Sequence, residues 1–284
     1  MKLSYDIADV APYINWAYFY FAWQVKEEEQ QRRMRSEAEE FLASLQGKYH
    51  TYALFRIVDA YADGDDIVIP EGRIPLLRQQ HGSPCLCLSD FIGPKQDAGV
   101  ETAVHGVNGD SPANVLSLSS IISNRIGLFA TSADKGLETD FDADPYQKMM
   151  AQLLADRLAE ATAELVHEAV RKHYWGYAPD ELLSVSEMQQ EHFQGIRPAV
   201  GYPSLPDASL NFLLDELLDF SQIGITLTEN GAMRPHASVS GLMLAHPQAH
   251  YFAVGKIATD QLNDYARRRG LPIDTIRKFL SANL

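Results

Sequence analysis

Apolar residues recur at helical spacing in two long stretches of the chain. Residues 26–46 are rich in strong helix formers, and most of their apolar side chains lie toward the C-terminal end. We therefore expect a helix whose first turns are exposed to solvent and whose last turns pack against the protein. Residues 144–172 predict the longest helix, because Asp144 can cap it and Pro145 suits its first position. The side chains expected in its buried stripe are Met150, Leu153, Leu154, Leu158, Ala161 and Leu165.

Shorter apolar runs bounded by turn-forming residues predict strands. They lie at 53–58, 66–69, 85–92, 125–131, 225–228, 238–244 and 251–257, with a loop expected over 93–112. Further helices are predicted at 181–192 and 208–221, and as two short helices within 260–284. Helices and strands follow one another without strict βαβ alternation, which indicates an α+β fold. The sequence shows no flexible linker, so we expect a single domain over residues 1–284.

Composition narrows the class of protein. The 284 residues carry a formal net charge of −14, which argues against nucleic acid or an anionic membrane as a partner. The two cysteines of the chain, Cys85 and Cys87, are separated by one residue and are poorly placed to form a disulfide with each other. This excludes a disulfide scaffold and fits a reducing cytoplasm. The aromatic run at 13–25 is too short to span a bilayer and contains Asn15, so we interpret it as buried core that also lines a site.

One loop suggests a binding function. Residues 195–207 read GIRPAVGYPSLPD, and their three prolines exclude a helix interior or a central strand. Gly201 would let a ligand approach the backbone, and Arg197 offers donors suited to a carboxylate or a phosphate. The alternative is a proline-rich connector with a surface arginine.

Standard catalytic motifs are absent. The sequence has neither of the two standard nucleotide-binding loops and no G-x-S-x-G nucleophile elbow. His246 and His250 are four apart, but Pro247 argues against a helix that would align them, and His236 has no nearby histidine. We interpret all three as structural or surface histidines.

Long segments of the chain, in order, resemble the activation (reactivation) domain of cobalamin-dependent methionine synthase. The segments are 144–181, GIRPAVGYPSLPD at 195–207, GITLTENGAMRPHASVSG at 224–241 and 246–270, with looser matches at 13–23 and 88–95. The resemblance implies a C-shaped single α+β domain with a twisted antiparallel β-sheet and flanking helices. It also implies that the domain binds S-adenosylmethionine (AdoMet) and docks on a cobalamin-carrying methionine synthase chain in the cytoplasm. There, oxidised cob(II)alamin is reduced by a flavodoxin-like electron donor and methylated from AdoMet, which restores methylcobalamin for methionine biosynthesis.

The resemblance assigns AdoMet-binding roles residue by residue. Arg197 corresponds to the arginine that holds the AdoMet carboxylate, and Glu160 to a helix glutamate near the amino acid end. The remaining matched positions are Asn15, Ala199, Gly201, Tyr202, Tyr251 and Phe252. The family implies no catalytic side chain and no metal ligand in this domain, because cobalt on the partner supplies the nucleophile. The domain therefore has no complete active site of its own.

Three departures from the family affect this expectation. Asn15 stands where the family's YIDW motif has an aspartate that contacts the AdoMet ammonium, so that charge is missing. After Pro206 the chain reads Asp207-Ala208-Ser209, where the family commonly continues D-H-T-E-K. The family domain usually ends a longer chain, whereas Met1 precedes it almost directly here, which predicts a free-standing protein that acts in trans. The alternative is a fragment of a longer chain.

Two other functions remain open at this point. One is an activation-domain fold that has lost AdoMet binding and serves as a docking or cap protein for a corrinoid partner, as Asn15 suggests. The other is an autonomous AdoMet-dependent methyltransferase with a small substrate of its own.

Overall fold

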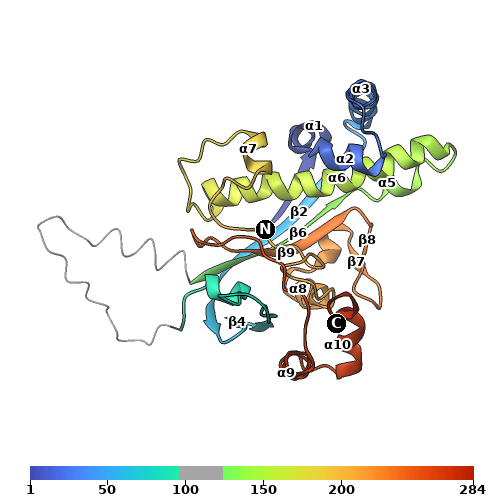
Figure 1. Ribbon diagram of the computed structural model, residues 1–284. Coiled ribbons are helices and arrows are strands. Elements are labelled where there is room, and N and C mark those ends of the chain that lie inside the picture. Colours follow the sequence, from blue (N-terminus) through green and yellow to red (C-terminus); the bar gives the residue numbers. More distant parts are fainter. Residues whose placement is uncertain (96–123) are drawn as a thin grey trace, which may run out of the picture. The chain divides into compact units, whose positions relative to one another are not determined.

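The computed structural model describes residues 1–95 and 124–284, which group into two compact units. Unit 1 comprises Met1–Arg56, Leu128–Phe193 and Ala208–Gly241, and unit 2 comprises Ile57–Gly127, Gln194–Asp207 and Leu242–Leu284. Each unit combines helices with β-structure (Figure 1), so the predicted α+β class is confirmed. A single domain over residues 1–284 stays a prediction.

A four-stranded sheet is the framework of unit 1. Its strand order is β1-β2-β6-β9, and β1 pairs antiparallel with β2, so that Lys2 lies opposite Leu54 and Asp6 opposite His50. The strands are β1 (Lys2–Asp6), β2 (His50–Asp59), β6 (Arg125–Ala133) and β9 (Ser238–Met243), of which the last three run on into unit 2.

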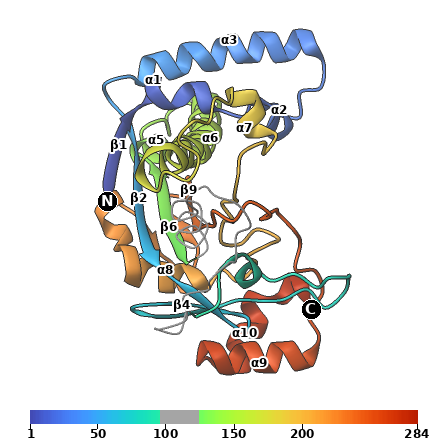
Figure 2. The same cartoon turned by 90° about the vertical axis from the view of Figure 1, so that its left-hand side faces the viewer.

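Strand β6 is covered on both faces. Because neighbouring strand residues point to opposite faces, Thr131 and Ser132 reach different layers. Thr131 Oγ1 donates to the carbonyl of Ala159 in α6 (Pro145–Ala169) at 3.0 Å, and Ser132 Oγ donates to the carbonyl of Ile223 at 2.8 Å. Helix α6 therefore packs on one face, and η4 (Phe220–Ile223), which follows α8 (Leu210–Leu218), packs on the other (Figure 2).

The remaining elements of unit 1 are short, apart from α3. They are α1 (Ile7–Val10), η1 (Ala11–Tyr13), α2 (Trp16–Ala22), α3 (Glu28–Leu45), α5 (Gly136–Thr139), a π-helical turn (Val170–Tyr174), α7 (Val185–Gln189), β7 (Thr226–Leu227) and β8 (Met233–Arg234). Both long predicted helices are confirmed, by α3 and by α6 with its π-helical extension. The aromatic run is only partly buried: Phe19 is inaccessible, but Tyr18 and Phe21 are 62% and 82% exposed, so the prediction of buried core is wrong for these two.

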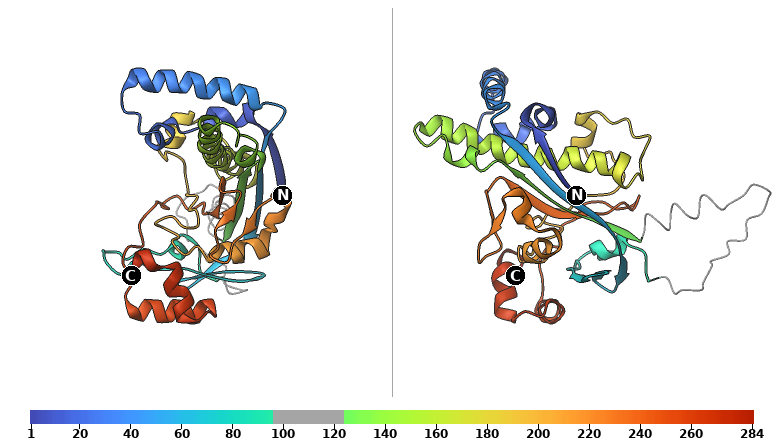
Figure 3. Two further views of the ribbon diagram at one scale, coloured as in Figure 1. Left: turned by 90° about the vertical axis from the view of Figure 1, so that its right-hand side faces the viewer. Right: turned by 180° about the vertical axis from the view of Figure 1, so that it is seen from behind.

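Unit 2 contains a small sheet and the C-terminal helices. The antiparallel strands β3 (Tyr61–Asp63), β4 (Asp66–Ile69) and β5 (Gly72–Pro75) are followed by η2 (Leu88–Phe91). Helices α9 (Thr259–Arg269) and α10 (Ile273–Phe279), drawn in red in Figure 3, pack together before η5 (Ser281–Asn283).

Two predicted strands are wrong, and both failures have a local cause. At 85–92 the side chain of Asp90 accepts from the N–H of Cys87 at 2.8 Å, which stabilises the turn η2. At 251–257 the backbone bonds go to separate segments: the N–H of Val254 donates to the carbonyl of Pro203 at 2.9 Å, and the N–H of Ile257 donates to the carbonyl of Asn283 at 2.7 Å. Most of the loop predicted at 93–112 lies outside the described residues.

Among the residues that the structure describes, no helix combines the length and the apolar character that crossing a membrane requires.

Candidate functional site

The loop at 195–207 lies in unit 2 and is fixed although it has no regular secondary structure. Ile196 and Leu244 exchange two backbone hydrogen bonds of 2.9 Å each, and the N–H of Leu242 donates to the carbonyl of Pro198 at 3.0 Å. Proline has no backbone N–H to donate, but its carbonyl can still accept, and here the N–H of Leu242 in the neighbouring segment is the donor. The loop is therefore an ordered part of unit 2.

A second segment, 251–254, runs along the other side of the loop. The N–H of Arg197 donates to the hydroxyl of Tyr251 at 2.9 Å. The N–H of Phe252 donates to Ser204 Oγ at 3.1 Å, and this hydroxyl in turn donates to the carbonyl of Phe252. Six of the predicted AdoMet residues come from these two segments, about 50 residues apart in sequence, and the structure brings the segments together.

The tip of the loop is open. Gly201 has φ +88°, is exposed, and has no neighbouring atom within 4 Å of the position that a Cβ would occupy. Tyr202 follows it with 52% of its surface exposed, Ala199 is buried, and Arg197 is half-buried. A ligand with an anionic group could thus meet a guanidinium, an open backbone and an aromatic ring on one loop.

The three histidines occupy the kinds of position that the sequence predicts. His246 and His250 flank the ring of Phe91, at centroid distances of 6.1 and 5.7 Å, and Phe252 lies 6.5 Å from the same ring. Burial lowers the pKa of His246. His236 lies in unit 1 with its side chain 89% exposed.

Asn15 caps a helix in unit 1. It stands before α2, and its Oδ1 accepts from the N–H of Ala17 at 3.2 Å. Asparagine and aspartate are equally good at such a position. The aspartate that the family resemblance implies at this position would therefore cap the helix no better than Asn15 does.

Glu160, the other predicted site residue of unit 1, is half-buried on α6. The segment that contains Asn15 contacts α6 on both sides of Glu160: Tyr13 donates to Glu168 Oε2 at 2.6 Å, and Arg157 Cζ lies 5.7 Å from the Tyr18 ring centroid. Within unit 1, Glu160 thus lies in the part of α6 that packs against this segment.

An acidic cavity in unit 1 was missed by the sequence analysis. It has a volume of about 380 Å³ and is lined by Glu138, Met149, Gln152, Leu153, Asp156 and His236. Burial raises the pKa of Asp156, although His236 Nδ1 lies 3.3 Å from its Oδ1 and opposes that shift. Glu138 accepts from the backbone N–H groups of His236 and Ala237. His236 lies 80 residues from Asp156 in the sequence, so no sequence spacing could have signalled the cavity.

The chain was compared with known families and solved structures. It matches the family described as vitamin B12 dependent methionine synthase, activation domain, over residues 6–270. The chain belongs to this activation-domain family. It is also similar to the crystal structure of the MetH reactivation domain bound to AdoHcy, with 34% sequence identity and a TM-score of 0.86, over 100% of this chain and 90% of that one. The resemblance drawn from the sequence and the activation-domain fold are thereby confirmed.

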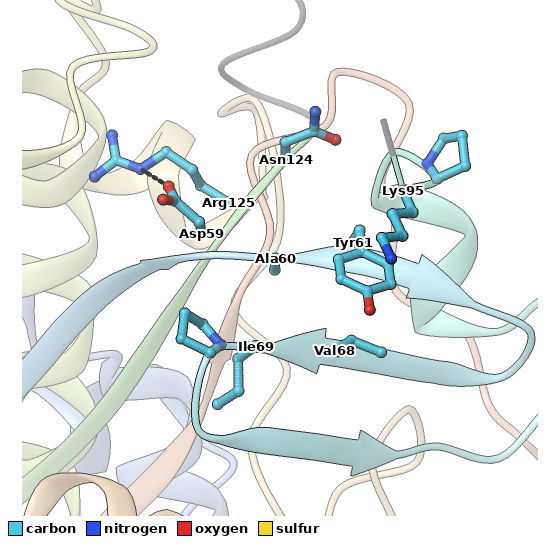
Figure 4. A pocket seen from close by; sticks show the side chains of 10 residues that line it. Asp59, Ala60, Tyr61, Val68, Ile69, Lys95, Asn124 and Arg125 are labelled. Atoms are coloured by element: carbon cyan, nitrogen blue, oxygen red, sulfur yellow. Dashed lines mark ion pairs between the residues drawn. The ribbon is translucent and has the colours of Figure 1, made fainter. Parts of the chain in front are cut away.

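The activation-domain fold also contains a larger cavity in unit 2, of about 670 Å³ (Figure 4). Lys95 Nζ lies 5.8 Å from the ring centroid of Tyr61, and Arg125 pairs with Asp59 at 3.9 Å. The lining residues are Asp59, Ala60, Tyr61, Val68, Ile69, Pro70, Pro94, Lys95, Asn124 and Arg125. None of them is a predicted AdoMet residue.

The raised pKa of Asp156 predicts a pH-dependent effect of Asp156→Asn. The folded protein keeps this proton over a pH range in which the unfolded chain has released it. Ionising Asp156 therefore lowers the free energy of unfolding as pH rises from its ordinary pKa, about 4, to the raised value. We expect Asp156→Asn to remove this fall, so that variant and wild type diverge with rising pH.

Urea unfolding between pH 4 and 8 measures this difference. Asp274→Asn, an exposed site on α10, serves as the control. A difference between Asp156→Asn and wild type that is constant at every pH would contradict the assignment.

Proposed function

We propose that this chain binds AdoMet and docks on a cobalamin-carrying methionine synthase chain, where it supports the reductive methylation of cob(II)alamin to methylcobalamin. The observation that carries the proposal is the Arg197 loop bonded to Tyr251, in a member of a family with an AdoHcy-bound structural relative. A flavodoxin-like protein would deliver the electron. Reducing conditions suit Cys85 and Cys87, so we place this reaction in the cytoplasm.

The residues of the loop fit the ligand. The amino acid end of AdoMet carries a carboxylate, which the guanidinium of Arg197 would bind, and an ammonium, which needs an acceptor. The backbone at Ala199 and Gly201 and the rings of Tyr202, Tyr251 and Phe252 would border the rest of the molecule. The family resemblance extends the proposed site to Asn15 and Glu160 for the ammonium.

The role of this chain would be to position its ligand. When bound, AdoMet would supply the methyl group, and cobalt on the partner would supply the nucleophile. In-line methyl transfer needs orientation and a suitable electrostatic environment more than an acid or a base. This accounts for a binding loop without a catalytic motif.

The alternative is a docking or cap protein that has lost AdoMet binding. It is favoured by Asn15, which brings no negative charge to the ligand ammonium. Calorimetric titration of the wild-type protein with AdoMet separates the two functions, because only the first predicts binding.

Replacing Arg197 by alanine should weaken AdoMet binding. Losing a charged hydrogen bond of about 1.5–3 kcal/mol corresponds to about tenfold to a hundredfold in the dissociation constant. Calorimetry on Arg197→Ala measures it, with Arg277→Ala on the exposed face of α10 as the matched control. Equal affinity of Arg197→Ala and wild type would exclude the proposed carboxylate contact.

Replacing Asn15 by aspartate should strengthen binding by about tenfold, since a carboxylate would then face the ligand ammonium. The helix cap is kept, because aspartate accepts from the N–H of Ala17 as asparagine does. The control is Ser184→Asp, which adds the same charge at the start of α7. Unchanged affinity would show that position 15 does not contact the ammonium.

Reactivation itself can be followed in the visible spectrum. A cobalamin-loaded methionine synthase fragment that lacks its activation domain is mixed with AdoMet, a reductant and this protein, and we expect methylcobalamin to form. The double variant Arg197→Ala/Tyr202→Ala should abolish the conversion, and Arg277→Ala should not. Equal conversion without this protein contradicts the proposal, and methyl transfer to a small molecule without any corrinoid protein would indicate an autonomous methyltransferase.

A further inference from the structure

The last residue of the binding loop is anchored in the interior of unit 2. Asp207 is fully buried, and the hydroxyl of Tyr265 donates to its Oδ2 at 2.7 Å. Arg269 Nε lies 3.5 Å from the same oxygen. Tyr265 and Arg269 both belong to α9, so this helix holds the end of the loop.

Helix α9 is itself tied to the small sheet of unit 2. Arg268 pairs with Asp66, which is buried in β4, and Arg268 Nη2 donates to the carbonyl of Leu76 at 2.9 Å. Its guanidinium carbon lies 5.5 Å from the Tyr265 ring centroid. Helix α9, which carries the donor Tyr265, is therefore held in place by its bonds to the small sheet.

The second segment of the site rests on the same helix. Val254 and Ile257 share one buried core with Leu262 and Tyr265, and Phe252 packs against it. The two segments that meet at the Arg197–Tyr251 hydrogen bond thus have a common support.

We propose that Tyr265 and Asp207 are positioning residues of the ligand site: their buried hydrogen bond fixes the end of the loop and so keeps Arg197 and Gly201 in the arrangement that binds. This inference rests on the proposed AdoMet binding. Neither residue needs to touch the ligand.

The chemistry of the pair suits a permanent anchor. Burial and the charge of Asp207 raise the pKa of Tyr265 well above its ordinary value, so its hydroxyl remains a donor at physiological pH. A hydrogen bond to a buried carboxylate is among the stronger ones in proteins, and removing the donor leaves the carboxylate poorly solvated. The prolines of the loop supply no backbone donors, so the loop has fewer hydrogen bonds that fix its conformation, and each one that remains matters more.

The test combines hydrogen–deuterium exchange with AdoMet calorimetry on the full chain. Tyr265→Phe removes only the hydroxyl, and Asp207→Leu removes the acceptor with a side chain of similar size. Tyr49→Phe is the matched control, because it removes another tyrosine–aspartate hydrogen bond, to Asp140 Oδ2 at 3.0 Å in unit 1. Melting temperature and circular dichroism identify a variant that fails to fold.

We expect Tyr265→Phe to speed exchange in peptides covering 195–207 and to weaken AdoMet binding by about tenfold, with Tyr49→Phe unchanged in both. If Tyr265→Phe does not fold, Asp207→Leu, which removes the acceptor, decides by the same two measurements. Unchanged exchange in a folded variant overturns the anchor. Faster exchange with unchanged affinity overturns the positioning role. If the wild type binds no AdoMet, the proposed function fails and so does the positioning role that rests on it, while the exchange data still decide the anchor.

Discussion

The loop at 195–207, where we propose that AdoMet binds, is held in part by bonds to segments distant in sequence. Pro198, Pro203 and Pro206 remove three backbone donors from 195–207, so neither a helix nor a sheet ladder can hold it. It is held by Leu244 on one side, by the hydroxyl of Tyr251 on the other, and by bonds within the loop such as that from the N–H of Gly201 to the carbonyl of Leu205 at 2.8 Å. Such a loop can leave backbone open to a ligand, as at Gly201, without a regular element that would block access. Bonds from outside the loop therefore contribute to its order, which is the physical basis for proposing that a buried pair away from the ligand site affects binding.

The acidic cavity of unit 1 is notable for a carboxyl group, Asp156, whose pKa is raised by burial. Asp156 is held in a half-buried position that disfavours its charge, although an exposed histidine faces it. A fold optimised only for stability would avoid such a carboxylate. Perturbed carboxyl groups in cavities are frequent at functional sites. Asp156 therefore belongs among the residues to be tested for function, alongside those that the family resemblance identifies.

The sequence predicted the elements that depend on residues close together in the chain. Helices α3 and α6 follow from periodicity and from the cap at Asp144, and the family follows from long ordered matches. The strand predicted at 251–257 failed because its partners are an irregular loop and the Ser204 hydroxyl, which no periodicity encodes. The aromatic run suggested buried core, yet the short helix α2 exposes Tyr18 and Phe21, since a helix turns its sides in different directions. The Asp156–His236 contact joins positions 80 residues apart and has no sequence signature.

Asn15 can cap helix α2 as an aspartate would, but it lacks the negative charge that an aspartate would offer to a ligand. The start of α2 requires an acceptor oxygen, which asparagine supplies through its Oδ1 as well as aspartate would. A ligand ammonium gains from a full negative charge, which asparagine lacks. The substitution is therefore silent for the backbone, and a structural match with a TM-score of 0.86 would look the same with either residue. Overall similarity identifies the fold and the family, whereas the proposed affinity for AdoMet would depend on a few charges that fold comparison does not weigh.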